Sequence, residues 1–174
     1  MRNLIIAACL LLLVGCADSH NMIPDLKYAQ TKLSTEGTTY IALPADGRYG
    51  EIHYDGSGAM VAQTLQAALL DYMVQVDIAS ETENYDTALN SARQGDYTYL
   101  FFPTITHWED RATEWSGIPD QIAVKLMVID SGSGSKLSSA NIDGKSGWAT
   151  LGGDHPQDLL PEPIKEYVDQ LFQK

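Results

Sequence analysis

Residues 121–143 read QIAVKLMVIDSGSGSKLSSANID, and this stretch decides the fold class. Apolar side chains occupy every second position from Ile122 to Val128, which is typical of a β-strand with one buried face. Residues 131–135 contain only serine and glycine and predict a hairpin loop. Residues 136–143 then alternate more weakly as the returning strand. The stretch therefore predicts an antiparallel hairpin inside a larger sheet.

Three more strands and two helices are predicted upstream of this hairpin. Residues 38–43 are rich in β-branched and aromatic side chains, and residues 97–102 form a continuous apolar run, typical of a strand covered on both faces. A short alternating strand over residues 74–78 lies between them. Apolar side chains at helical spacing predict a helix from about residue 59, with Leu65 on its buried face. A shorter helix over residues 85–92 ends at Gly95.

A last helix over residues 156–172 completes the order β-α-β-α-β-β-β-α. Right-handed crossovers make the first three strands parallel, and the later hairpins alternate in direction. We therefore predict an α/β (α+β) fold: one domain, residues 38–174, with a mixed five-stranded sheet backed by helices. A chain of this length buries enough surface for one core.

The amino terminus has the pattern of a secreted bacterial precursor. Arg2 is followed by 11 apolar residues, 4–14, which suits a signal peptide and is too short to span a bilayer. The run ends in Leu13-Val14-Gly15-Cys16, which resembles the bacterial lipobox. The resemblance implies that residues 1–15 are cleaved off, that the Cys16 thiol carries diacylglycerol, and that the new amino group is acylated.

Residues 16–37 are predicted to be the lipidated cysteine and a flexible tether, because the segment is polar and lacks a sustained apolar period. In lipoprotein sorting, an aspartate directly after the lipidated cysteine favours the inner membrane. Here that position is Ala17, and Asp18 comes one residue later. We therefore expect a lipid-anchored domain on the outer membrane that faces the periplasm, with the inner membrane as the alternative.

The mature chain is acidic. Loss of Arg2 with the signal peptide changes the net charge from −12 to −13. Such a surface repels phosphate backbones and anionic headgroups, so nucleic acid is not an expected partner. Cys9 leaves with the signal peptide and Cys16 is used for lipid, so neither a disulfide nor a cysteine-ligated metal is expected. We predict no cofactor and no metal.

Four loops are predicted at one end of the sheet, which we call the rim: residues 44–58, 79–84, 108–119 and 144–155. Open α/β sheets bind ligands beyond the carboxyl ends of their strands. All three tryptophans fall in two of these loops, and indole faces stack on sugar rings, peptide side chains or protein partners. The candidate binding residues are Trp108, Glu109, Asp110, Arg111, Glu114, Trp115, Trp148, Asp154 and His155. The alternative is that the indoles pack against the end of the sheet and that Arg111 pairs with a neighbouring acid.

Catalytic interpretations of the rim have less support. Glu109 and Asp110, or either with Glu114, resemble the acid pair of a glycosidase, but adjacent acids on a strand point apart. The chain's histidines fit neither H-E-x-x-H nor G-x-S-x-G spacing. The segment DGSG, residues 55–58, lacks the lysine of a phosphate loop, and Ser57 as a helix N-cap explains it better. Asp154 or His155 is similarly predicted to cap the last helix.

Three strings carry a resemblance to a known family: DGRYGEIHYDGSG (46–58), HWEDRATEWSGIPDQIAVKL (107–126) and GKSGWATLGGDHPQDLL (144–160). They resemble the bacterial lipoproteins of domain of unknown function 4823, over about residues 40–160. The resemblance implies Gram-negative envelope lipoproteins without an assigned activity, and it supplies no catalytic residues. The order of elements is also similar to the amino-terminal domain of TolB, to the curli secretion lipoprotein and to LpoB.

Those fold relatives act through protein contacts, although a fold does not determine a function. We therefore expect a module that binds an envelope protein or peptidoglycan and is not an enzyme. Two alternatives stay open: an envelope hydrolase acting through the acids of the 108–115 loop, and a subunit of an oligomeric ring.

Overall fold

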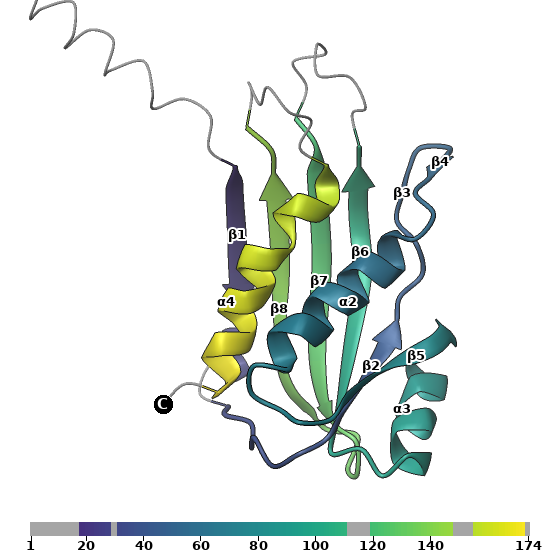
Figure 1. Cartoon of the computed structure of the whole chain (residues 1–174), viewed down its shortest axis with the longest axis vertical. Helices are drawn as coiled ribbons and strands as arrows, with labels where there is room; N and C mark the ends of the chain where they lie inside the picture. Colours follow the sequence, from purple (N-terminus) through teal and green to yellow (C-terminus); the bar gives the residue numbers. More distant parts are fainter. Residues whose placement is uncertain (1–17, 29–30, 111–118, 148–154, 173–174) are drawn as a thin grey trace, which may run out of the picture.

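The computed structural model describes residues 18–28, 31–110, 119–147 and 155–172. They form a six-stranded sheet of order β1-β8-β7-β6-β2-β5 and a separate hairpin, β3-β4 (Figure 1). The strands are β1 (Ser19–Pro24), β2 (Thr39–Leu43), β3 (Arg48–Tyr49), β4 (Ile52–His53), β5 (Val76–Thr82), β6 (Tyr99–Glu109), β7 (Gln121–Asp130) and β8 (Lys136–Lys145). The helices are η1 (Leu26–Tyr28), α2 (Ser57–Leu69), α3 (Tyr85–Gln94), η2 (Pro156–Leu159) and α4 (Pro161–Phe172), where η marks a 3₁₀ helix.

The directions of the strands agree with the prediction. β2 pairs in parallel with both β5 and β6, whereas β7 pairs antiparallel with both β6 and β8. The fold is therefore a single α+β domain with a mixed sheet.

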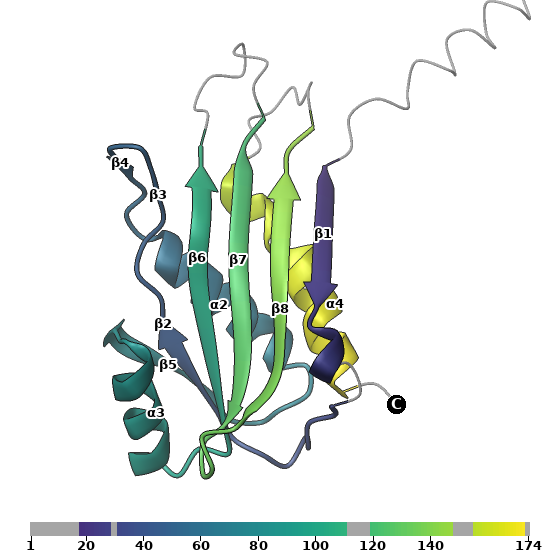
Figure 2. The same cartoon turned by 180° about the vertical axis from the view of Figure 1, so that it is seen from behind.

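Helices α2 and α4 cover one face of the sheet, and α3 packs on the other face beside β2 and β6 (Figures 1 and 2). The alternation in β7 is confirmed, because Ile122, Val124, Leu126 and Val128 are all buried in the core beneath α2 and α4. Leu65 of α2 is also fully buried. A smaller core lies under α3 and includes Leu89 and Leu100.

The sheet has six strands, not the five predicted, because β1 forms within the segment expected to be a tether. β1 pairs antiparallel with β8 along its whole length, from Ser19 opposite Lys145 to Pro24 opposite Ala140. Its side chains alternate between exposed and half-buried, but the half-buried positions include His20 and Pro24. The hydrophobic pattern is therefore weak, and the strand is held by backbone pairing to an edge that would otherwise be open, by Met22 against the core, and by His20 next to Glu162 and Glu166 of α4.

The ends of several elements differ from the prediction. β6 extends seven residues beyond Phe102, to Glu109, because β7 pairs with it over that length. β5 begins at Val76, and Val74 is 97% exposed in the preceding turn. The last helix is divided into η2 and α4, since Pro161 begins a new helix at a position that tolerates the missing N–H.

Candidate functional site

The rim lies where the chain leaves β6 and β8 and enters β7 and β1. Glu109 pairs with Gln121, Gln121 with Lys145, and Lys145 with Ser19, so four strand ends are level at this edge. The hairpin β3-β4 reaches the same end of the molecule, and the loop of residues 131–135 lies at the opposite end (Figure 1). This arrangement agrees with the predicted topology.

Trp108 does not belong to an exposed binding surface. It lies within β6 opposite Ile122, and only 2% of the residue is exposed. A bulge between Ile105 and His107 shifts the alternation of β6 and directs Trp108 into the core beneath α2 and α4. Gly47 packs so closely on the indole side chain that a Cβ there would lie 2.4 Å from Trp108 Cβ. For this tryptophan, the alternative of an indole that packs the end of the sheet is correct.

Glu109 is also covered. Its side chain is 3% exposed, and its Oε2 lies 3.3 Å from Nε2 of His107, which is 35% exposed. The ring of Tyr49, from β3, meets His107 edge-on with the ring centres 5.4 Å apart. Of the predicted acid pair Glu109–Asp110, only Asp110 is therefore open to a substrate.

Asp110 and His155 are brought together from the two tryptophan-containing loops. Asp110 Oδ2 lies 3.7 Å from His155 Nδ1, and the two side chains are 28% and 55% exposed. The Asp110 backbone N–H donates to the Tyr54 hydroxyl at 3.2 Å, which joins this corner to the β3-β4 segment. His155 occupies the N-cap position of η2, where its backbone N–H donates to the Asp158 carboxylate. The contact links the bases of two loops that are 45 residues apart in the chain.

The remaining candidates, Arg111, Glu114, Trp115, Trp148 and Asp154, lie outside the described residues, as does Cys16.

The DGSG segment has a structural role that differs from the prediction. Gly56, with φ of 88°, occupies the N-cap position of α2, a left-handed conformation that favours glycine. The Asp46 carboxylate accepts hydrogen bonds from the N–H groups of Gly56 and Gly58 at 3.1 and 2.7 Å. Asp46 therefore caps the helix, in place of Ser57, and it fixes the base of the β3-β4 hairpin to α2.

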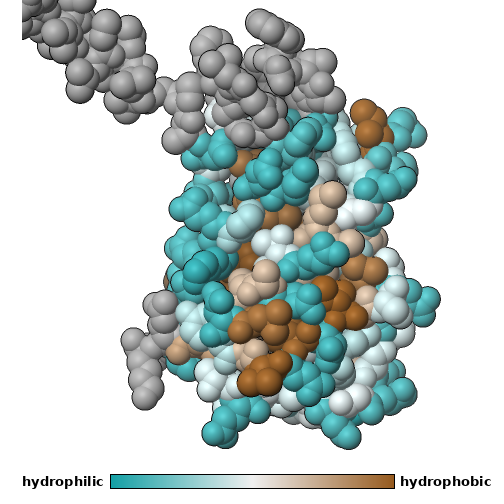
Figure 3. All heavy atoms as spheres, viewed as in Figure 1, coloured by the Kyte–Doolittle hydropathy of each residue, from teal (hydrophilic) through white to brown (hydrophobic). Residues whose placement is uncertain are grey.

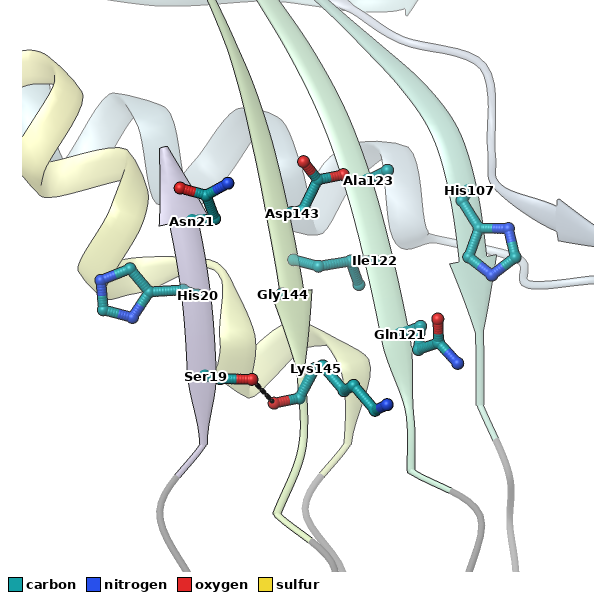
Figure 4. Close-up of a pocket in the computed structure, with 10 residues that line it drawn as sticks. All are labelled: Ser19, His20, Asn21, His107, Gln121, Ile122, Ala123, Asp143, Gly144 and Lys145. Atoms are coloured by element: carbon teal, nitrogen blue, oxygen red, sulfur yellow. Dashed lines mark hydrogen bonds between the residues drawn. The ribbon is translucent and has the colours of Figure 1, made fainter. Parts of the chain in front are cut away.

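A polar hollow of about 400 Å³ lies at the rim end of the sheet (Figure 4). It is lined by Ser19, His20, Asn21, His107, Gln121, Ile122, Ala123, Asp143, Gly144 and Lys145. One row of these residues, His107, Ala123, Asp143 and Asn21, runs directly across β6, β7, β8 and β1. Figure 2 shows these four strands in front of α2 and α4, so the row lies on the face that those helices leave open.

The chemistry of the polar hollow is balanced. Asp143 and Lys145 offer opposite charges, Gln121 and Asn21 offer amides, and His107 adds an imidazole. Asn21, Asp143 and Lys145 are exposed. These residues provide hydrogen-bond donors and acceptors for a ligand, and the charges of Asp143 and Lys145 cancel. Within the described residues, no group of three or more histidine, cysteine and acidic side chains is suited to hold a metal ion.

Sequence reasoning missed the polar hollow. The alternation of polar residues in β7 and β8 is visible in the sequence, but the row exists only because β1 completes it.

A second hollow, of about 520 Å³, lies beyond the carboxyl ends of β2 and β5. Its acids are already engaged, since Asp46 caps α2 and Glu83 accepts hydrogen bonds from Tyr40 and Ser91. Burial, with the Glu83 contact second, raises the pKa of the Tyr40 phenol to about 12. These groups stabilise the fold, so we give the second hollow less weight.

Comparison with known proteins identifies the family of this chain. The model of the family described as Domain of unknown function (DUF4823) matches residues 31–171. The chain belongs to this family. No curated protein matches it in sequence. Among the described segments, no helix combines the length and apolar character that spanning a bilayer requires.

Two solved structures show the same fold. The PelC dodecamer from Paraburkholderia phytofirmans is 17% identical, with a TM-score of 0.62, over 90% of this chain and 99% of that one. Lipoprotein GNA1162 from Neisseria meningitidis is 15% identical, with a TM-score of 0.52, over 77% of the present chain and 96% of the GNA1162 chain. Identities this low establish the fold and leave the function open.

Proposed function

We propose that this protein is a lipid-anchored lipoprotein of the bacterial envelope that binds an envelope protein or the cell wall. The observation that carries the proposal is the polar hollow, which gathers exposed polar side chains from four adjacent strands on the sheet face left open by α2 and α4. One side of the polar hollow is formed by β1, which begins three residues after Cys16, so the binding surface and the anchor are close in the chain.

The anchor rests on the lipobox Leu13-Val14-Gly15-Cys16. Two or three acyl chains on Cys16 are sufficient for stable attachment, whereas one chain is marginal. GNA1162, which has the same fold, carries the name lipoprotein. The residue after Cys16 is Ala17, which favours the outer membrane with the domain in the periplasm.

The polar hollow suits a polar partner such as a peptide or a glycan. It is shallow and combines charged and amide groups with a larger apolar area, which suits a partner that offers hydrogen-bonding groups together with apolar faces. The rim residues Asp110 and His155 lie at the same end of the sheet and extend the contact surface. The sequence predicts further contact residues at the rim, and we keep them in this proposal: Arg111, Glu114, Trp115, Trp148 and Asp154.

Photo-crosslinking in intact cells tests the contact surface. A crosslinking amino acid at Asn141, an exposed position two residues before Asp143 on β8, is expected to give partner adducts. Substitution of Asp143→Asn with Lys145→Gln is expected to reduce them. Gln63, exposed on α2, is the matched control position and is expected to give none. Digestion of peptidoglycan before electrophoresis distinguishes a protein adduct from a cell-wall adduct.

Equal adducts from Gln63, or adducts that the double substitution leaves unchanged, would show that the polar hollow is not the contact surface.

A second candidate role is a subunit of a homo-oligomer. The PelC structure is named a dodecamer and matches 90% of this chain. Here Met60, Leu70 and Val74 are 38%, 51% and 97% exposed along α2 and the turn after it, where Figure 3 shows apolar surface. Light scattering on the purified protein tests this role, since an oligomer held by that surface is expected to dissociate in a Leu70→Ser variant.

A further inference from the structure

The connection between the anchor and the folded domain is very short. This inference rests on the proposed lipidation of Cys16. The Asp18 carboxylate accepts a hydrogen bond from the Gly147 N–H at 2.9 Å, and β1 begins at the next residue. Only Ala17 therefore separates Cys16 from a residue held against the domain. Two residues span at most about 7 Å, whereas the 20-residue tether expected from the sequence would reach roughly 70 Å.

The attachment point also selects one end of the molecule. Asp18, Ser19 and Gly147 lie at the rim end of the sheet, and the loop of residues 131–135 lies at the other end. β8 connects the two ends with 10 residues, which is about 30 Å at the usual rise of a strand. A membrane reached through Cys16 is therefore near the rim and far from the 131–135 loop.

The β3-β4 hairpin provides a second surface at the same end. Tyr49 and Ile52 are 41% and 56% exposed there, and Figure 3 shows a small hydrophobic area bordered by hydrophilic residues at the corner where Figure 1 places the hairpin. Within residues 48–53 the charges of Arg48 and Glu51 balance, and the exposed Asp55 follows at the base of the hairpin. Aromatic and aliphatic side chains such as Tyr49 and Ile52 suit the boundary between headgroups and acyl chains.

The hairpin is held firmly in this position. Tyr49 packs on His107, the Tyr54 hydroxyl accepts a hydrogen bond from Asp110 N–H, and Asp46 ties the base of the hairpin to α2. The surface of Tyr49 and Ile52 is thus a rigid part of the domain, on the far side of the sheet from β1 (Figure 1).

We propose that the domain lies close to the membrane with the start of β1 nearest the lipid, and that Tyr49 and Ile52 of the β3-β4 hairpin make a second contact with the headgroup region. The lipid on Cys16 and the hairpin then support opposite sides of the sheet. In this orientation the polar hollow opens sideways, close to the membrane surface, and a partner binds there and not at a distance from the bilayer.

Fluorescence quenching in phosphatidylcholine vesicles tests the orientation. Lipidated protein is labelled at a single introduced cysteine, Glu51→Cys on the hairpin or Ser133→Cys in the opposite loop, with quencher-bearing lipids in the vesicles. Cys9 is lost with the signal peptide and Cys16 is acylated, so the introduced thiol is the only free one. We expect strong quenching at position 51 and only background quenching at position 133. Equal quenching at both, or stronger quenching at position 133, would overturn the orientation.

Two further variants separate the contributions. A 20-residue Gly-Ser insertion between Ala17 and Asp18 leaves the lipid in place and is expected to remove most of the quenching at position 51. Tyr49→Ser with Ile52→Ser is expected to weaken it while the short connection stays intact. Unchanged quenching in either variant contradicts the role given to that feature.

Flotation with the vesicles and incorporation of labelled palmitate report on the anchor separately. A protein that neither floats nor carries palmitate refutes the lipidation of Cys16, whereas one that floats without selective quenching refutes only the orientation.

Discussion

Replacement of Trp108 by alanine distinguishes a core residue from a binding residue. Only 2% of this residue is exposed, and it lies opposite Ile122 in the sheet and packs on Gly47. If this environment is correct, the substitution leaves a cavity between the sheet and the loop that precedes the β3-β4 hairpin. The expected effect is a loss of stability, with partner binding reduced only as far as folding is reduced.

The size of the loss follows from the buried area. A buried aromatic side chain removes about 150–250 Å² from water, and each Å² contributes about 25 cal/mol, which gives about 4–6 kcal/mol. Measured substitutions of this kind cost about 3–5 kcal/mol. We therefore expect Trp108→Ala to lower the free energy of unfolding by about 4 kcal/mol and the melting temperature by about 10 °C.

Urea unfolding of residues 17–174, followed by far-ultraviolet circular dichroism, measures this loss. His155→Ala is the matched control, because its side chain is 55% exposed at the same rim, and a change within about 0.5 kcal/mol is expected. A loss below about 1 kcal/mol for Trp108→Ala would refute the burial of the indole, and the prediction of an exposed aromatic rim would then apply to this residue after all.

Four other predictions concern the anchor and the fold. Cys16→Ser is expected to abolish incorporation of labelled palmitate and to leave an uncleaved or soluble precursor; continued labelling contradicts the lipoprotein assignment. Leu65→Ala and Leu126→Ala, both buried, should each lower the free energy of unfolding in urea by about 2–5 kcal/mol, and losses below about 1 kcal/mol would show that these side chains are not in the core. Asp46→Ala removes the cap of α2 and should cost about 1–2 kcal/mol, whereas Asp46→Asn should recover part of it in the same assay. The pKa of the Tyr40 phenol is about 12 in the folded state and about 10 when the chain is unfolded. The free energy of unfolding should therefore fall as the pH rises from 10 to 12. Urea titrations should show a smaller fall for Tyr40→Phe.

Much of the fold could be predicted from local patterns. The buried faces of α2, β7 and α4 follow from periods of 3.6 and two, because each side chain's direction depends only on its neighbours along the same element. The parallel arrangement of β2, β5 and β6 follows from the helical crossovers that connect them. For these features the sequence alone was sufficient.

The candidate site was predicted less well, because it depends on which strands meet and in which register. The rim was located correctly, but the bulge in β6 turned Trp108 inward and left Asp110 and His155 as the exposed candidates among the described residues. No local pattern reveals such a bulge, since it is set by pairing with β7.

The position of the proposed anchor relative to the domain is likewise a tertiary property. The resemblance of residues 13–16 to a lipobox and the acidic composition can be read from the sequence without the fold. Whether residues 17–37 form a tether or a strand was decided by hydrogen bonds to β8, more than 100 residues later in the chain. Those bonds are formed by the backbone, which is the same for every side chain, so only the tertiary structure shows that β1 begins at the rim, three residues after Cys16 in the chain.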